Sequence, residues 1–516
     1  MPSAQTDQLF KLIKTLSKSE KRTFKLYVNR IQGVETAKFI QLFDVFDKQK
    51  KYDEEAVFKK IPSIKRSQLS NLKRHLTKQL LTSLRLIHIS KNIDIEIREQ
   101  LDFAKILYGK GLFLQSLKVL DRVKNIAFES HQDLLHLEII EFEKMIEARH
   151  ITRSIENRAD QLTEESERRG NIVLNTVHLS NLALKMYGFY IKIGHVRDEK
   201  ETREVQAFFQ ANLPQNIEYG QMTFFEKIYF YQAHVWYFYT LQNFPKHYRY
   251  AQKWVNLFDE HPLMVGQDPG LYMRGLHNLL TALFYISHYQ KFCRNLDKLE
   301  AFYAENLESF NTNSEILGFL YVFTAKINKH FMEGSFSEGL ALVLPLEKLL
   351  NKYEIYLDSH RIIVFYYKIA CLYFGSGDND HAIDYLNLIL NFKAGKLRED
   401  IQSYARILHL IAHYEEGHYN LLEYLIKSVY RFLKKMEELN VVQKEILKFL
   451  KRELYSDPHR LRQAFAVLKT KLEKLKEHPL HGRSFLYLDI ISWLESKIEN
   501  KSVQEVVQSK FVERRR

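Results

Sequence analysis

The segment "HLIAHYEEGH" has the residue types and spacing of a metal site. His409 and His413 stand four residues apart, and Glu416 and His418 follow closely. Two histidines one helical turn apart can hold zinc. The segment lacks the H-E-x-x-H order that gives a metalloprotease its catalytic base, and His413 also fits a repeat position that favours packing. We therefore expect no metal ion here.

Other side chains that could do chemistry lack activating neighbours. The sequence has no G-x-x-x-x-G-K-[ST] phosphate loop, no G-x-G-x-x-G motif and no serine in a G-x-S-x-G turn. "FGSGDND" contains spaced acids but not the closing glutamate of a calcium loop. We predict that the protein is not an enzyme, has no catalytic residue and binds no cofactor.

The two cysteines, Cys293 and Cys371, stand among apolar residues of predicted helices. Two cysteines cannot form a disulfide framework, so we interpret both as small core residues in a reducing compartment. The first residues contain no apolar run suited to a signal peptide, and no segment approaches about 18 uninterrupted apolar residues. These features predict a cytoplasmic protein without a membrane span.

The strongest feature that could bind a ligand is the basic segment "IKRSQLSNLKRHLTKQLLTSLR" at residues 64–85, within a run from Ala56 to Ile93 that has no acid. At 100° per residue its leucines share one side of a helix. Arg74, Lys78 and Arg85 fall nearly opposite them. The candidate residues for binding nucleic acid or an acidic partner are Arg66, Lys73, Arg74, Lys78 and Arg85.

Three interpretations of this basic segment remain open. The first is contact with nucleic-acid phosphates, which would be non-specific and sensitive to salt. Together with the residues before it, the segment has the pattern of a helix–turn–helix, with a short helix, a turn and a second helix. However, the turn contains Pro62 and the second helix is long for a recognition helix. The second is an acidic protein surface or an anionic membrane. The third is a solvated helix face without a partner.

Charge is distributed unevenly along the 516 residues, whose net charge is +13. Residues 1–100 contain 21 Lys and Arg against 11 Asp and Glu, and residues 418–516 contain 21 against 13. The middle of the chain is therefore mildly acidic. This asymmetry bears on partners and not on fold.

The elements that must position these residues are helices. Apolar residues recur at helical spacing almost everywhere, no segment alternates like a strand, and the chain has only 18 Gly and 9 Pro. A repeat is also visible, in which an aromatic or apolar residue precedes a turn residue by four positions. The expected turns are at positions 111, 194, 243, 288, 334, 377 and 417. The first gap is 83 residues and the others are 40 to 49. Because the first gap is about twice the others, a further, degenerate copy is expected near 151–153.

The best copy has Tyr373, Gly377 and Ala382 and resembles the tetratricopeptide-repeat family. The likeness covers roughly residues 100–435, with a longer period than the 34 residues typical of that family. The resemblance implies a non-catalytic binding scaffold. We expect an all-α superhelical solenoid of about eight helix hairpins, with a small helical N-terminal module and C-terminal capping helices.

These features predict three parts and a general function. The parts are a basic helical N-terminal module at 1–100, a repeat array at 101–435 and C-terminal capping helices at 436–516. The predicted function is a scaffold or adaptor for a protein or peptide partner. The alternative is a nucleic-acid-associated regulatory or ribonucleoprotein factor. The aromatic segment 224–244 provides Tyr237 and Tyr239 as candidates for lining a partner groove, with core packing as the alternative for either ring.

Overall fold

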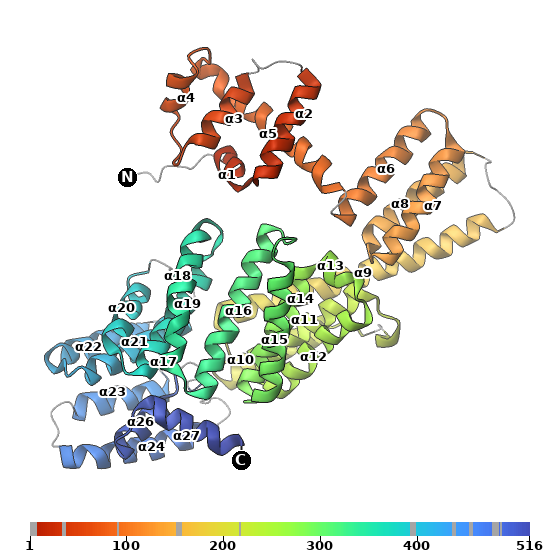
Figure 1. Ribbon diagram of the computed structural model, residues 1–516. Coiled ribbons are helices and arrows are strands. Elements are labelled where there is room, and N and C mark those ends of the chain that lie inside the picture. The colour runs from red at the N-terminus through yellow and green to blue at the C-terminus, as the bar shows by residue number, and fades with distance from the viewer. Residues whose placement is uncertain are drawn as a thin grey trace. The chain divides into compact units, whose positions relative to one another are not determined.

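The computed structural model describes residues 8–32, 38–89, 92–150, 157–215, 218–392, 399–435, 440–453, 458–476, 485 and 488–515. All regular elements in these ranges are helices, so the predicted all-α class is confirmed (Figure 1). The chain divides into two compact units, Met1–Gly170 and Asn171–Arg516. This division is coarser than the three parts expected, so the boundaries at 100 and 435 stay predictions.

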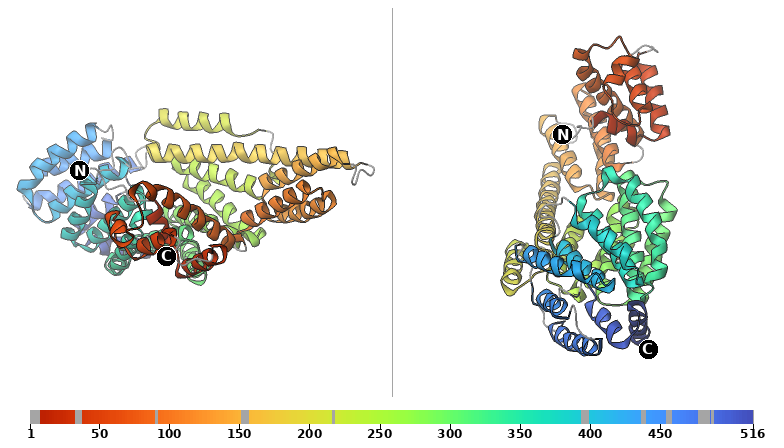
Figure 2. Two further views of the ribbon diagram at one scale, coloured as in Figure 1. Left: turned by 90° about the horizontal axis from the view of Figure 1, so that it is seen from above. Right: turned by 90° about the vertical axis from the view of Figure 1, so that its left-hand side faces the viewer.

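The first unit contains eight helices and the start of a ninth. They are α1 (Gln8–Thr15), α2 (Lys18–Gln32), α3 (Lys38–Lys48), α4 (Glu55–Lys60), α5 (Arg66–His88), α6 (Ile93–Gly109), α7 (Phe113–Glu129), α8 (Asp133–Arg149) and α9 (Arg158–Ile193). α9 continues into the second unit, and Figure 2 shows it as one unbroken helix.

The first five helices share one core. α3 packs against α1, α4 and α5, and α2 also packs against α5. Phe24, Phe43 and Phe46 fill the centre, and Leu76 and Leu80 of α5 join them. α2 begins with a capping box, because Ser17 Oγ accepts from the Glu20 amide at 3.1 Å and Glu20 Oε2 accepts from the Ser17 amide at 2.7 Å.

A buried ion network links α7, α8 and α9 in the first unit. Glu143 of α8 has no solvent exposure, and its carboxylate contacts Lys124 Nζ of α7 at 3.0 Å and the Arg158 guanidinium of α9. Lys124 also contacts Glu165 Oε2 of α9 at 3.1 Å. Because buried charges are costly unless paired, this network fixes the first turns of α9 against the α7–α8 hairpin.

The second unit continues from α9 with helices of similar length. They are α10 (Glu199–Asn212), α11 (Phe224–Thr240), α12 (Phe244–Glu260), α13 (Leu263–Gln267), α14 (Pro269–Tyr285), α15 (Tyr289–Asn306), α16 (Thr312–Glu333), α17 (Phe336–Gly339), α18 (Val343–Lys352), α19 (Ser359–Ser376), α20 (Asn379–Leu390), α21 (Glu399–Glu415), α22 (Tyr419–Lys435), α23 (Val441–Glu453), α24 (Pro458–Lys476), α26 (Ile490–Glu499) and α27 (Val503–Arg515). Each long helix from α11 to α24 packs mainly on near neighbours in the sequence.

A left-handed backbone occurs at, or one residue before, each of the seven predicted turn positions. Five expected glycine turns have positive φ, a conformation that glycine adopts without steric cost: Gly111, Gly194, Gly334, Gly377 and Gly417. At the two turns without glycine, the left-handed residue comes one position earlier than expected, at Gln242 and Ser287. A further turn, at His131 between α7 and α8, was not expected. The copy predicted near 151–153 lies outside the described residues.

Small residues nine positions after the aromatic or apolar residue of the repeat, at 116, 339 and 382, permit close helix crossings. Ser116 and Ala382 are fully buried, and Ser116 Oγ donates to the Ala104 carbonyl at 2.8 Å. At Gly339 a Cβ atom would come within 2.8 Å of the Leu372 side chain. These positions explain why the second helix of a hairpin can lie tightly against its neighbours.

The last helix returns to earlier helices of the second unit. α27 packs on α26 and also on α16 and α19, and Figures 1 and 2 show it beside the end of α16. The Ser337 amide donates to Gln504 Oε1 at 2.8 Å, and the Phe511 ring meets the edge of Tyr289 at 4.8 Å. α27 therefore packs against the middle of the second unit. From the sequence we expect it only to cap the end of the repeat array.

Within the described part of the chain, no helix is both long enough and apolar enough to cross a membrane.

Candidate functional site

The basic face of α5 has the geometry expected from its sequence. Arg74, Lys78 and Arg85 are exposed on the side opposite the buried leucines. With Thr77, Leu81 and Thr82 they line a shallow hollow of about 570 Å³. We call these six residues the α5 ridge. Leu81, at the centre of the ridge, is 53% exposed, so the ridge offers apolar as well as cationic contacts.

Two of the five candidate residues lie on the flank of α5 and not on the ridge. Arg66 pairs with Glu55 Oε2 at 2.7 Å, and Lys73 pairs with Glu54 Oε2 at 3.2 Å. Lys73 also donates to the Tyr52 hydroxyl at 2.7 Å, and only 18% of its side chain is exposed. Both cations therefore attach α5 to the α4 region, and the structure separates them from Arg74, Lys78 and Arg85.

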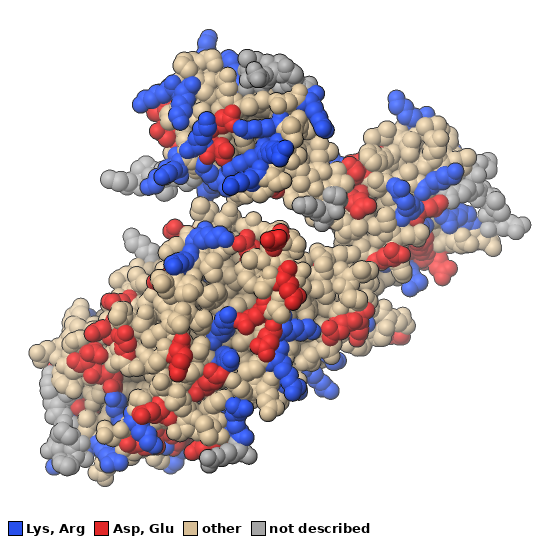
Figure 3. All heavy atoms as spheres, in the orientation of Figure 1, with Lys and Arg blue, Asp and Glu red and all other residues tan. Residues whose placement is uncertain are grey.

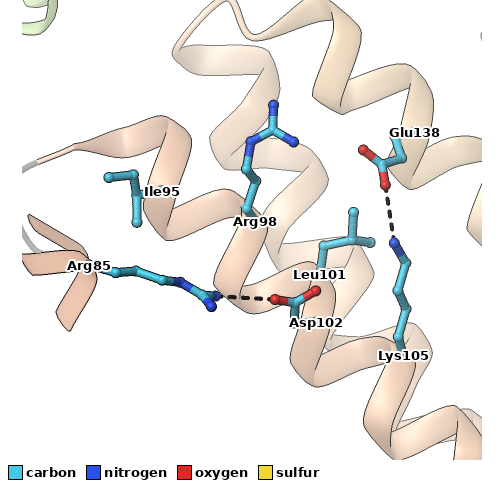
Figure 4. A pocket seen from close by; sticks show the side chains of 7 residues that line it. All are labelled: Arg85, Ile95, Arg98, Leu101, Asp102, Lys105 and Glu138. Atoms are coloured by element: carbon cyan, nitrogen blue, oxygen red, sulfur yellow. Dashed lines mark hydrogen bonds and ion pairs between the residues drawn. The ribbon is translucent and has the colours of Figure 1, made fainter. Parts of the chain in front are cut away.

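The far end of the ridge adjoins a pocket of about 380 Å³ between α5, α6 and α8 (Figure 4). Arg85 reaches from α5 to Asp102 Oδ2 at 3.2 Å, and Lys105 reaches Glu138 Oε1 at 3.1 Å. Arg98, which also lines the pocket, pairs with Asp94 at 3.3 Å. The pocket's cations are thus offset by acids, so it has little attraction for an anion.

Arg74 and Lys78 differ from the other candidates because neither forms an ion pair within the described residues. Figure 3 shows that Lys and Arg also dominate the visible face of the first helices, with few acids among them. Arg74 and Lys78 themselves line the hollow of the α5 ridge, where their charges are open to an anionic ligand.

The aromatic pair proposed for a groove lies in the core. Tyr237 and Tyr239 are 7% and 9% exposed. The Tyr237 ring stacks on Phe209 of α10 at 4.0 Å, and the Tyr239 ring packs on His195 at 4.7 Å. Both rings therefore hold helices together. Sequence periodicity alone does not separate such core positions from groove positions, because aromatic partners pack on α11 from more than one side.

His409, His413 and His418, the candidates for a metal site, form a chain of contacts. His413 Nε2 lies 3.2 Å from His409 Nε2, and His413 Nδ1 lies 2.9 Å from His418 Nδ1. Because His413 uses a different ring nitrogen for each neighbour, the three rings do not converge on one point. No group of three metal-ligating side chains occurs anywhere in the described ranges.

Both cysteines are free and half-buried, so they are less enclosed than a core position implies. Burial raises the pKa of the Cys371 thiol to about 12. Since the thiolate is the reactive form, Cys371 has little reactivity near neutral pH.

A second basic site lies in the second unit and was missed in the sequence. Its residues come from three helices: Arg274 and His277 from α14, Tyr321 and Asn328 from α16, and Arg361 and Lys368 from α19. α16 packs against both α14 and α19. We call these six residues the α14–α16–α19 face.

Two side-chain contacts connect this face. The His277 ring stacks on Tyr321, with centroids 4.2 Å apart and an interplanar angle of 14°. Lys368 Nζ donates to Asn328 Oδ1 at 2.5 Å. Tyr321 and Asn328 are seven residues apart and so share one side of α16. The contacts therefore place His277 and Lys368 along the same surface of α16.

The surroundings of the histidine in the α14–α16–α19 face lower its pKa. Burial, followed by the charges of Lys368, Arg274 and Arg361, lowers the pKa of His277 to about 3. Burial also lowers the pKa of Lys368, to about 8, which leaves the amine mostly protonated at pH 7. His277 is consequently neutral and the three cations define the charge of the face.

Acids offset only part of this charge. Arg361 Nε lies 3.5 Å from Asp358 Oδ2, whereas Arg274 and Lys368 form no ion pair within the described residues. Tyr187 of α9 borders the same space: burial raises the pKa of its phenol, and the charges of Arg361, Asp358 and Arg274 act on it. The available sequence signal was the spacing of Arg361 and Lys368, but it did not reveal which helices adjoin.

Comparisons with known proteins found no relative: no family model matches the chain, and no curated protein or solved structure is similar to it. The resemblance to tetratricopeptide repeats thus has the helical architecture and the turns as its support.

Proposed function

We propose that the protein is a non-catalytic interaction scaffold that binds a protein or peptide partner. In this proposal the helices from α6 onward stack as a solenoid of about eight hairpins, and the last helices brace it. The recurrent left-handed turns and the packing of helices on their sequence neighbours support that arrangement. Stacked hairpins of this kind provide extended surfaces for partners.

The observation that carries the proposal is the α14–α16–α19 face. It brings Arg274 and Lys368, neither of which forms an ion pair within the described residues, to one surface made by three packed helices. Lys368 is partly buried, and a partly buried charge without a counter-charge is unfavourable in an isolated protein. A partner that supplies negative charge removes this penalty, which is a reason to assign the face to binding.

Affinity capture from the native lysate tests the proposal. The tagged full-length protein is incubated with and without nuclease, at low and at high salt, and bound proteins are identified by mass spectrometry. We expect a specific protein that remains bound after nuclease treatment. Recovery of nucleic acid alone, with every protein lost after nuclease, would contradict the proposal.

A second candidate function is nucleic-acid binding through the α5 ridge. It is favoured by one observation, the exposure of Arg74 and Lys78 without ion pairs in the described residues. Such cations contact phosphates and release counterions, which makes affinity fall steeply with salt.

The double variant R74A/K78A tests this candidate in the full-length chain. Removing two phosphate contacts should lower the slope of log affinity against log salt by about 2 for duplex DNA. The control R22A/K11A removes two exposed cations from α1 and α2 and should change the slope less. Binding that is unchanged by R74A/K78A would exclude the ridge.

A further inference from the structure

We propose that the α14–α16–α19 face binds the side-chain carboxylates of an acidic peptide segment in extended conformation. This inference rests on the proposed function and names the chemistry of the partner. The face itself supplies the recognition: two arginines, one lysine and a neutral histidine on three adjoining helices.

The charge balance of the face favours an anion. Arg274, Arg361 and Lys368 give the face a positive charge that two nearby acids offset only in part. Asp358 lies 3.5 Å from Arg361 Nε, and Asp268 has a pKa that burial raises and the charge of Arg274 lowers. The guanidinium groups of Arg274 and Arg361 can each form bidentate hydrogen bonds with a carboxylate. Lys368 is held in place by Asn328 at 2.5 Å, so its ammonium is already oriented before a ligand arrives.

The spacing of the cations suits an extended chain better than one compact anion. Arg361 and Lys368 are seven residues apart, which is about 10 Å along a helix, and packed helices lie about 8 to 10 Å apart. An extended peptide advances about 3.3 Å per residue. Because α14 and α19 both pack on α16, their axes are up to two such spacings apart, about 20 Å. Roughly six extended residues span that distance, and acids within such a segment reach cations on both α14 and α19.

The aromatic rings of the face favour a peptide over single-stranded nucleic acid. Proteins that bind single strands offer free ring faces on which bases stack. Here His277 and Tyr321 stack on one another at 4.2 Å. These rings already use one face for packing inside the protein.

A capped hexaglutamate peptide provides a direct probe. The N-terminus is blocked with a fluorophore and the C-terminus is an amide, so that only side chains carry negative charge. Fluorescence anisotropy with the full-length protein at low salt should give saturable binding, and added salt should weaken it. A hexalysine peptide made in the same way should not bind to this site.

The variants R274A and R274A/R361A locate the binding. R274A removes an exposed residue without a described ion pair, so folding should be unaffected, and we expect at least a threefold weaker affinity. The double variant should lose at least tenfold. The control R249A/R294A removes exposed arginines of α12 and α15 and should bind within twofold of the wild type.

Three outcomes would overturn the inference. They are absence of saturable hexaglutamate binding, equal loss in R274A/R361A and R249A/R294A, and tighter binding of a hexauridine oligonucleotide at the same arginines. The lysate capture does not use hexaglutamate. A partner captured there while the peptide fails would reject this inference and leave the proposed function standing.

Discussion

Gly334 and Gly377 both end a helix with a left-handed backbone, at φ of 72° and 91°, but their surroundings differ. A Cβ atom at Gly334 would lie 2.7 Å from the backbone nitrogen of Gln508 in α27, whereas a Cβ atom at Gly377 meets nothing within 4 Å. The turn pattern predicted both glycines. It did not predict that α27 would return to one of them.

This difference gives a matched pair of variants. G377A should cost about 1 kcal/mol, because alanine is strained in the left-handed region. G334A should cost more, by about 1 to 3 kcal/mol, because a rigid backbone must also move. Thermal unfolding of the two variants measures the difference. Equal melting temperatures would show that α27 does not pack against this turn.

Buried histidines set the expected response to acid. Burial is the first cause of lowered pKa values at five positions: about 4 at His136, His234 and His409, and about 3 at His247 and His277. Their unfolded pKa is about 6.5. The unfolded chain therefore binds more protons below pH 6.5, and stability is lost as the pH falls from about 6.5 toward 4.

The replacement H247L tests this link. Removing one such histidine should reduce the dependence of unfolding free energy on pH by about 1.4 kcal/mol per pH unit between pH 4 and 6. The control H381Q removes an exposed histidine whose pKa is raised by its hydrogen bond to Asp378, so it is protonated in both states at pH 4 to 5.5. Denaturant titrations at several pH values supply the measurement, and identical slopes for H247L and the wild type would refute the account.

At the scale of elements, the sequence predicted where helices and turns lie, but not which helices pack against one another. Periodic leucines located the buried side of α5, and therefore the exposed Arg74 and Lys78. The same periodicity could not separate Lys73, because its pairing with Glu54 depends on where α4 lies. It also could not show that Tyr237 meets Phe209 or that α14 and α19 adjoin α16. Such contacts depend on tertiary packing.

The return of α27 can be tested on the helix itself. Val506 is 4% exposed and Val512 is 50% exposed. V506D places a charge in an apolar interface and should lower stability by about 2 to 4 kcal/mol, whereas V512D should have little effect. Melting temperature and limited proteolysis near the C-terminus report the result. Equal sensitivity of the two variants would mean that α27 is not docked.

At the scale of the whole molecule, the chain consists of two compact units that meet within α9. The contacts of Glu165 belong to the first unit, and the α14–α16–α19 face belongs entirely to the second. We therefore expect the fragment 171–516 to fold cooperatively, with strong helical circular dichroism. A fragment that melts without cooperativity would show that the second unit needs the first.

The most direct test of the scaffold proposal compares three tagged full-length proteins in nuclease-treated native lysate. They are the wild type, R274A/R361A and R74A/K78A. The account predicts that the wild type and R74A/K78A capture the same protein partner, and that R274A/R361A loses it. Loss of every captured protein from the wild type after nuclease treatment would contradict the account, as would a partner that R274A/R361A retains and R74A/K78A loses.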